Sequence, residues 1–310
     1  MCKSLCGFGL CVFVLAGLCL VPAVDAGSRW PMETVDTFSF DVGSGSEFKV
    51  DVPDGDLVLK RGSANRVDIE IRLGARDMAQ ARDRYDAMNF RASADDGRVL
   101  FQANHVRSFN WMNSGGFHIV VEVSLPADLD MDIETDDGDV SIEAATGNLV
   151  LRTSDGDVHV GLASGPETII SSSDGDIVVD ELNSRTSKIT TSDGDIRARR
   201  IAGGEVRIST SDGDIRIDDA GGAVSARSGD GDIRVEVEVF QELSLETSDG
   251  DIEIRTGSAG ADLDLRGESV TVRGAFDGQK SETMAKGSLN GGGPLLRAST
   301  RDGSVEVSAR

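Results

Sequence analysis

A short motif, Asp-Gly-Asp followed by Val or Ile, recurs every 18 or 19 residues and constrains the fold more than any other feature. The copies begin at Asp137, Asp155, Asp174, Asp193, Asp212, Asp230 and Asp249. A degenerate copy, Asp302-Gly303-Ser304-Val305, lies close to the C-terminus. A fixed period of about 20 residues is typical of repeat proteins in which similar units stack.

One repeat contains two stretches that alternate apolar and polar residues. Val206–Thr210 alternates, Ser211–Asp214 interrupts, Ile215–Asp218 alternates again, and Ala220-Gly221-Gly222 interrupts once more. Alternation places the apolar side chains on one face of a strand and the polar ones on the other. Asp-Gly suits a corner because Gly reaches positive φ without steric cost and Asp can hydrogen-bond the following backbone. Each repeat is therefore predicted to form strand, corner, strand, corner.

Two arrangements of these strands are consistent with one repeat. Asp-Gly between alternating residues also indicates a β-hairpin. The constant phase of the corners favours a solenoid, because a coil must keep like residues stacked from one turn to the next. We predict an all-β, single-chain β-solenoid with 18–19-residue turns and two short strands per turn over residues 127–310.

Residues 27–126 are predicted to form a β-rich capping region with one helix. Phe48–Leu59 already contains strand, Asp-Gly-Asp corner and strand. In Arg76–Phe90, residues Met78, Ala81, Tyr85 and Met88 recur at three- and four-residue steps, which indicates an amphipathic helix. We expect this helix to cap the open first turn, because an uncovered sheet edge presents unpaired backbone groups.

Residues 1–26 have the organisation of a cleaved secretory signal peptide. Lys3 precedes the apolar run Leu5–Leu20, and Val24-Asp25-Ala26 resembles a cleavage site. The mature chain is therefore expected in the periplasm, on the cell surface or outside the cell, without a transmembrane segment. All four cysteines precede residue 20, so the mature chain has no thiol for disulfides or catalysis.

The chain carries a net charge of −23, which signal removal does not change because Lys3 and Asp25 cancel. Nucleic acids and anionic membranes are therefore expected to be poor partners, and we predict no binding to nucleic acid. The 39% hydrophobic content and clear periodicity indicate a folded protein rather than an acidic tail.

Stacked corners would align the aspartates in two columns. The first column comprises Asp155, Asp174, Asp193, Asp212, Asp230 and Asp249, and the second comprises Asp157, Asp176, Asp195, Asp214, Asp232 and Asp251. Calcium would relieve the repulsion between neighbouring carboxylates. The alternative is that these side chains cap their own turns and that nearby arginines neutralise them: Arg197, Arg207, Arg216, Arg227, Arg234 and Arg255. No dedicated cofactor is predicted, with weak calcium binding along the columns as the alternative.

No catalytic motif is recognisable. His105, His118 and His159 are scattered. Paired carboxylates can cleave glycosidic bonds, so a polysaccharide-modifying enzyme remains an alternative. A pair that repeats at every turn indicates a scaffold, because an active site normally interrupts a repeat. We therefore predict that the protein is not an enzyme.

One segment concentrates aromatic residues in an aromatic-poor chain. Phe109, Trp111 and Met112 lie between His105 and Gly116. Exposed on a loop, they would form a partner-binding site. Alternatively, they fold back onto the predicted helix near Met78 and Tyr85.

These features resemble a bacterial β-strand-repeat family of unknown function known as "putative adhesin". The resemblance rests on the serial corners, on Pro126 before an alternating run, on Gly291-Gly292-Gly293-Pro294 and on Thr300–Val305, and it covers most of residues 34–310. It implies a secreted or envelope-associated β-solenoid, with some relatives linked to envelope-stress responses and no assigned catalytic activity. It assigns no functional residue.

We therefore predict an exported, non-enzymatic, adhesin-like β-solenoid that acts as a binding or structural protein of the bacterial cell envelope. Its partner would be an unidentified component of the envelope or cell surface. The alternatives are a calcium-dependent structural module and a polysaccharide-modifying enzyme.

Overall fold

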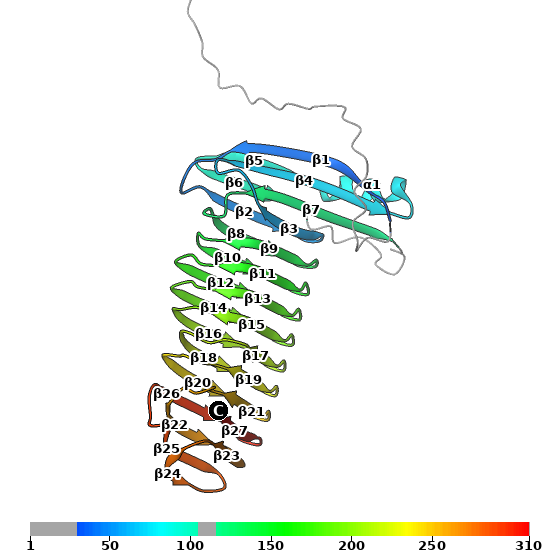
Figure 1. Ribbon diagram of the computed structural model, residues 1–310. Coiled ribbons are helices and arrows are strands. Elements are labelled where there is room, and N and C mark those ends of the chain that lie inside the picture. The colour runs from blue at the N-terminus through cyan, green and yellow to red at the C-terminus, as the bar shows by residue number, and fades with distance from the viewer. Residues whose placement is uncertain (1–29, 105–115, 310) are drawn as a thin grey trace, which may run out of the picture.

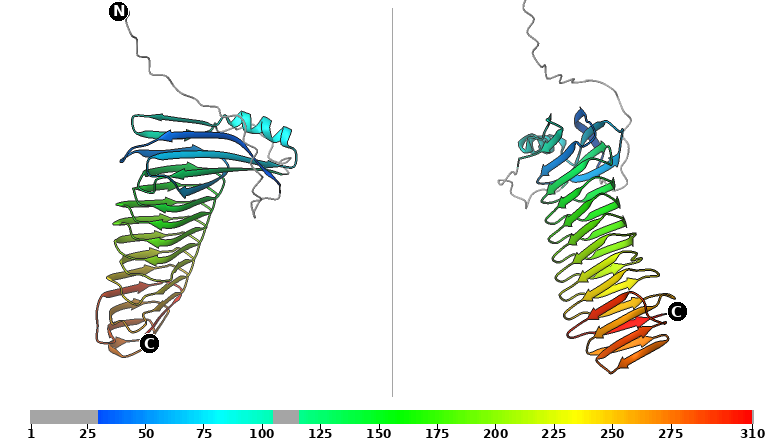
Figure 2. Two further views of the ribbon diagram at one scale, coloured as in Figure 1. Left: turned by 45° about the horizontal axis from the view of Figure 1, so that its top comes forward. Right: turned by 90° about the vertical axis from the view of Figure 1, so that its left-hand side faces the viewer.

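The protein is a rod built from two facing β-sheets, as the computed structural model shows for residues 30–104 and 116–309 (Figure 1). The predicted signal peptide lies outside these described residues. Sheet A contains 13 of the described strands and sheet B contains 14. Successive turns stack along the rod, so the two sheets face each other over its length (Figure 2).

Each repeat contributes one strand to each sheet. Sheet A receives β9 (Val140–Ala145), β11 (Val158–Ala163), β13 (Ile177–Leu182), β15 (Ile196–Ile201), β17 (Ile215–Ile217), β19 (Ile233–Glu236) and β21 (Ile252–Arg255). Sheet B receives β8 (Asp130–Thr135), β10 (Leu149–Arg152), β12 (Glu167–Ser171), β14 (Thr186–Thr190), β16 (Glu205–Ser209), β18 (Ala223–Arg227) and β20 (Glu242–Glu246). All these neighbours pair in parallel. The predicted β-solenoid with two strands per turn is confirmed.

The core is a set of aliphatic columns between the sheets. Ile196 pairs with Ile215, and Ile215 pairs with Ile233, and each is at most 1% exposed. Val206 and Ile208 face them from sheet B and are at most 2% exposed. The inward positions predicted from alternation are thus correct, because the period of two along a strand leaves only one face for the apolar side chains.

The corner glycines stack so closely that a side chain would not fit. A Cβ atom on the corner Gly would lie 2.0 to 2.1 Å from the carbonyl oxygen of the corner Gly one turn before. This holds for Gly156, Gly175, Gly194, Gly213, Gly231, Gly250 and Gly303. Among the corner glycines only Gly55 (φ 112°) and Gly138 (φ 105°) have positive φ. The sequence-based reason for Gly was therefore wrong at most corners: close stacking, rather than backbone handedness, requires it.

The N-terminal end interleaves segments that are distant in the chain. The rung β2 (Glu47–Val52) and β3 (Asp56–Arg61) pairs on one side with β8 and β9 and on the other with β6 (Arg98–Gln102) and β7 (Phe117–Leu125). The predicted corner at Asp54-Gly55-Asp56 therefore stacks on the corner at Gly138. Antiparallel strands β4 (Arg66–Ala75) and β1 (Met32–Asp41) extend sheet A, and β5 (Arg91–Asp95) extends sheet B.

The predicted helix is present as α1 (Met78–Met88). Asp77 caps its N-terminus by accepting hydrogen bonds from the amides of Ala79 and Gln80. Tyr85 is buried, donates a hydrogen bond to Asp36 of β1 and stacks on Phe90. The helix packs beside the N-terminal strands, but β1 and β5 are the outermost strands of the two sheets. The unpaired sheet edges at this end therefore belong to β1 and β5. That the helix caps the first turn stays a prediction.

The C-terminal end also departs from chain order. The chain forms β22 (Ala261–Arg266) and β23 (Ser269–Arg273), then the antiparallel strands β24 (Phe276–Lys280) and β25 (Met284–Leu289). It then returns, and β26 (Leu295–Ser299) lies between β20 and β22 while β27 (Ser304–Ser308) lies between β21 and β23. The last segment of the chain is therefore an interior rung (Figure 1).

Among the described residues, no helix is both long enough and apolar enough to span a membrane.

Candidate functional site

The second aspartate column is a ladder of side-chain-to-backbone hydrogen bonds. Asp195 Oδ1 accepts from the amide of Asp214 at 2.8 Å, and Asp214 Oδ1 accepts from the amide of Asp232 at 2.8 Å. The same bond, at 2.7 to 3.1 Å, joins the remaining members of the column: Asp56, Asp139, Asp157, Asp176, Asp232, Asp251 and finally Ser304. Each carboxylate therefore satisfies the amide that would otherwise be unpaired at the next corner.

The first column belongs to the same corners, two residues before the second. Asp174, Asp193 and Asp212 are exposed. At the N-terminal end the column is more crowded: burial together with the nearby Asp137 carboxylate raises the pKa of Asp54. Burial, Asp155 and Asp136 likewise raise the pKa of Asp137. Carboxylates at this end therefore bind protons more readily than ordinary aspartates.

The columns do not form a compact metal-binding cluster. Within residues 30–104 and 116–309, no group of three or more His, Cys, Asp or Glu side chains could hold a metal ion. In the second column one oxygen of each carboxylate already accepts a backbone hydrogen bond. Calcium binding by the two columns stays a prediction.

A third column, of buried hydroxyl groups, was not predicted. Thr210 Oγ1 lies 3.1 Å from the carbonyl oxygen of Ser192 and 3.2 Å from that of Gly194, and it accepts from the amide of Gly213 at 3.2 Å. Equivalent buried positions are Thr153, Ser172, Thr191, Ser228, Thr247 and Thr300. The sequence could have predicted this hydroxyl column, because Ser or Thr occurs two residues before every one of these Asp-Gly pairs. The corner motif is thus a hydroxyl residue, any residue, then Asp-Gly.

The arginines have different partners from those predicted. Of the six predicted to neutralise the corners, only Arg234 contacts corner aspartates, Asp232 at 2.8 Å and Asp214 at 3.7 Å. The other five pair with acidic residues outside the corners: Arg197, Arg207, Arg216, Arg227 and Arg255. The prediction was wrong for these five because outward side chains on strands reach their neighbours on the same face sooner than the corner.

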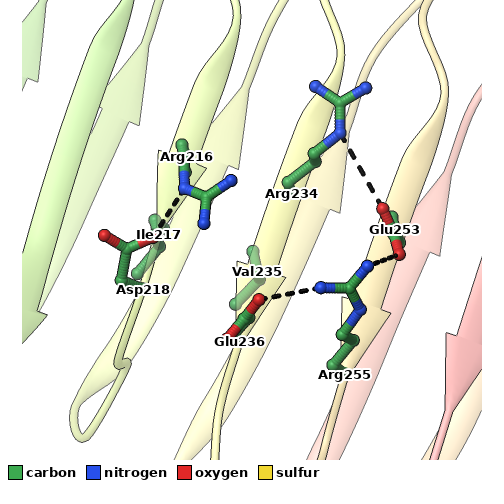
Figure 3. A pocket seen from close by; sticks show the side chains of 8 residues that line it. All are labelled: Arg216, Ile217, Asp218, Arg234, Val235, Glu236, Glu253 and Arg255. Carbon is green, nitrogen blue, oxygen red and sulfur yellow. Dashed lines mark hydrogen bonds and ion pairs between the residues drawn. The ribbon is translucent and has the colours of Figure 1, made fainter.

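Three of these arginines line a groove on the outer face of sheet A (Figure 3). The groove has a volume of about 190 Å³ and crosses β17, β19 and β21. It is lined by six charged residues, Arg216, Arg234, Arg255, Asp218, Glu236 and Glu253, and by the buried Ile217 and Val235 between them. We call these eight residues the sheet-A groove.

Ion pairs hold the walls of the sheet-A groove in place. Arg255 contacts Glu253 at 2.6 Å and Glu236 at 2.9 Å, so one guanidinium joins two strands (Figure 3). Arg216 contacts Asp218 at 2.6 Å. Burial alone would raise the pKa of Asp218, but hydrogen bonds from Arg197 and Arg216 hold it below its ordinary value. The groove therefore presents three cations and three anions, with Arg216 beside Arg234 on the neighbouring strand and Arg234 beside Glu253.

The described histidines each contact one aspartate. His159 Nε2 lies 2.9 Å from Asp180 Oδ2, and His118 Nε2 lies 3.3 Å from Asp56 Oδ2. In the described ranges no hydroxyl group hydrogen-bonds to either ring.

The predicted partner-binding residues Phe109, Trp111 and Met112, together with His105, lie outside the described residues. Partner binding by this segment stays a prediction.

Comparison with known proteins gives the following likenesses. A Parabacteroides distasonis protein described as a putative lipid binding protein matches at TM-score 0.48 and 12% identity, over 91% of this chain and 97% of that chain. A putative adhesin from the same organism matches at TM-score 0.47 and 12% identity, over 90% and 98%. A putative adhesin from Bacteroides fragilis matches at TM-score 0.40 and 12% identity, over 90% and 97%.

No curated protein sequence matches the chain. The family model described as Toastrack DUF4097 matches residues 64–258 and again 169–308. The two matches overlap and together span more than half of the chain, including every complete Asp-Gly-Asp repeat after the first corner. They confirm the resemblance inferred from the serial corners. The chain belongs to the Toastrack DUF4097 family, a family of proteins with a domain of unknown function.

Proposed function

We propose that the chain is an exported, non-enzymatic, adhesin-like protein that binds a component of the bacterial cell envelope or surface. The observation that carries the proposal is the sheet-A groove, a preformed polar groove over three rungs of a rigid sheet. The organisation of residues 1–26 supports export to the periplasm, the surface or the exterior.

The rigidity of the groove favours binding. Its strands pair in parallel on both sides, and Arg255 crosslinks β19 and β21 through Glu236 and Glu253. Binding to a surface whose side chains are already ordered costs little conformational entropy. The groove is therefore suited to a ligand that contacts several rungs at once.

The charges that line the sheet-A groove indicate which class of ligand it could bind. Three arginines and three carboxylates line the groove, so it is locally neutral on a chain of net charge −23. Successive strands repeat at about 4.8 Å. An extended polar polymer lying along the rod axis, such as an envelope polysaccharide, would meet a donor or a carboxylate at each rung.

Co-sedimentation with bacterial envelopes tests this proposal. Full-length chain is mixed with envelopes from its own bacterium, and the bound fraction is measured against protein concentration. Arg234→Glu removes the arginine that contacts Asp232 and Glu253 and reverses the charge in the groove. We expect it to raise the apparent dissociation constant about tenfold, which corresponds to a loss of about 1.4 kcal/mol of binding free energy.

Arg227→Glu is the matched control. Arg227 is an exposed, ion-paired arginine on sheet B, and its replacement changes the net charge from −23 to −25, as Arg234→Glu does. This control should bind like the unaltered chain. Equal losses in both variants would indicate binding by net charge and would overturn the groove as the site. Failure of the unaltered chain to sediment with any envelope fraction would overturn the proposed function itself.

A further inference from the structure

The C-terminal segment, residues 295–308, lies in a slot between two rungs that both precede it in the chain. Strand β26 pairs with β20 on one side and β22 on the other, and β27 pairs with β21 and β23. Without this segment, the edges of both rungs that face it would be unpaired. Such facing edges are a template for an added strand pair.

The segment carries all the contacts that a rung of this solenoid needs. Leu296, Val305 and Val307 are fully buried. Thr300 Oγ1 lies 2.9 Å from the carbonyl oxygen of Gly250. The amide of Ser304 donates to Asp251 Oδ1 at 2.7 Å. The segment therefore fits the slot through its own residues, whatever chain precedes it.

The connection to the rest of the chain is a short turn: the amide of Asn290 donates to the carbonyl oxygen of Ala275 at 2.7 Å, and the amide of Asp262 donates to that of Pro294 at 3.0 Å. Residues 290–294 read Asn-Gly-Gly-Gly-Pro, and none of them is buried. Asn290, Gly291 and Gly292 have φ of 50°, 87° and 82°. Glycine allows such a turn to take other conformations once these few bonds open, so the turn then restricts the direction of the following segment weakly.

We propose that residues 295–308 are an exchangeable rung, which fills the same slot in a second copy of this chain when copies fold together. Two copies that exchange segments reciprocally form a closed, symmetric dimer with every strand pair of the monomer retained. The partner is thus the identical segment of another copy.

The fraction of molecules that exchange the segment depends on competition between the chain's own tethered segment and the segment of a second copy. A short flexible tether gives an effective concentration of about 1 mM. Refolding at about 100 µM should then exchange the segment in about a tenth of the molecules, and refolding at about 1 µM in about a thousandth.

Disulfide trapping tests the exchange in the full chain. Cys2, Cys6, Cys11 and Cys19 are replaced by Ser. One population then carries Glu253→Cys and the other Glu306→Cys, at outward positions that pair across β21 and β27. Parallel neighbours lie about 4.8 Å apart, within the Cα–Cα range of a disulfide. We expect a covalent dimer after joint refolding and oxidation, rising about a hundredfold between 1 and 100 µM.

Two controls make the result decisive. The first pairs Glu306→Cys with Glu246→Cys, which lies on sheet B and measures the background of random crosslinks. No excess over this background would overturn the proposal. The second needs no disulfide: the unaltered chain, refolded at 100 µM, should contain a dimer that persists after dilution, and a monomer alone would overturn the proposal.

Discussion

At a corner, three residue positions contact the backbone. The buried hydroxyl of Thr210 bonds two backbone groups, Gly213 stacks on Gly194, and Asp214 Oδ1 accepts the amide of Asp232. The bond from the Gly213 amide to Thr210 closes the corner itself, and the other contacts join one turn to the next. The motif is therefore explained by the requirement to satisfy and stack backbone at every turn.

Substitution of a corner glycine should be costly for steric reasons. A Cβ atom at Gly194 would lie 2.1 Å from the carbonyl oxygen of Gly175, so Gly194→Ala must push two turns apart. We expect a loss of about 1–3 kcal/mol in the free energy of unfolding, measured by denaturant titration. Gly43→Ala is the control, because no atom lies within 4 Å of its added Cβ and φ is not positive. Equal stability of the two variants would refute the stacking explanation.

The aspartate ladder can be probed by separating charge from hydrogen bonding. Asp214→Asn keeps an oxygen that can accept the amide of Asp232, whereas Asp214→Ala leaves that amide without its partner. We expect Asn to change the free energy of unfolding little and Ala to lower it by about 1–3 kcal/mol. The same unfolding titration measures both. A large loss with Asn would show that the negative charge itself is required.

Among the elements, the first complete rung differs from the interior ones. Strands β2 and β3 lie between two rungs that follow them in the chain, and their corner brings Asp54, Asp56 and Asp137 together. Burial and repulsion from neighbouring carboxylates raise the pKa of all three, although the nearby His118 partly offsets this at Asp56. Ionisation of this corner therefore opposes folding.

A pH dependence of stability follows from this corner. A carboxyl group whose pKa is raised by folding contributes stability below its ordinary pKa of 3.8, and loses that contribution as pH rises through the folded value. Asp54→Asn should therefore raise the melting temperature at pH 7, and the gain should disappear below about pH 4. Circular dichroism melts at both pH values measure this. Asp212→Asn, at the equivalent position of an interior rung, is the control, and an identical gain there would contradict the assignment to this corner.

On the scale of the whole molecule, the rod combines two acidic columns at its corners with ion-paired faces. The corner aspartates repeat along the solenoid, while arginines on sheet A pair mainly with acids of the same face. Neighbouring carboxylates about 4.8 Å apart repel by roughly 0.9 kcal/mol in water. This repulsion is what a bound divalent cation would relieve.

The calcium alternative is tested by melting the full chain in chelator and in millimolar calcium. If the columns serve only as corners, we expect the melting temperature to change by less than a few degrees, because loosely bound ions contribute little. Magnesium at the same concentration controls for ionic strength. A large rise specific to calcium, lost in a variant with Asn at Asp193, Asp212 and Asp230, would favour a calcium-dependent module instead.

The sequence alone determined the repeating part of this protein. Its period, the alternation in Val206–Ile217 and the Asp-Gly corners predict the strands, the inward residues and the solenoid, because each depends on contacts within one turn or between identical turns. The helix at Met78–Met88 was predictable for the same reason, since an apolar stripe at helical spacing is a local pattern.

The tertiary structure alone decided the order of rungs at both ends and the partners of the arginines. Rungs share one inward pattern, so the edge of β20 accepts β26 as readily as the strand that follows it in the chain. The sheet-A groove likewise depends on which side chains lie side by side across β17, β19 and β21. Such choices are made by pairing between distant segments and by the directions of long side chains, and neither is encoded in a local pattern.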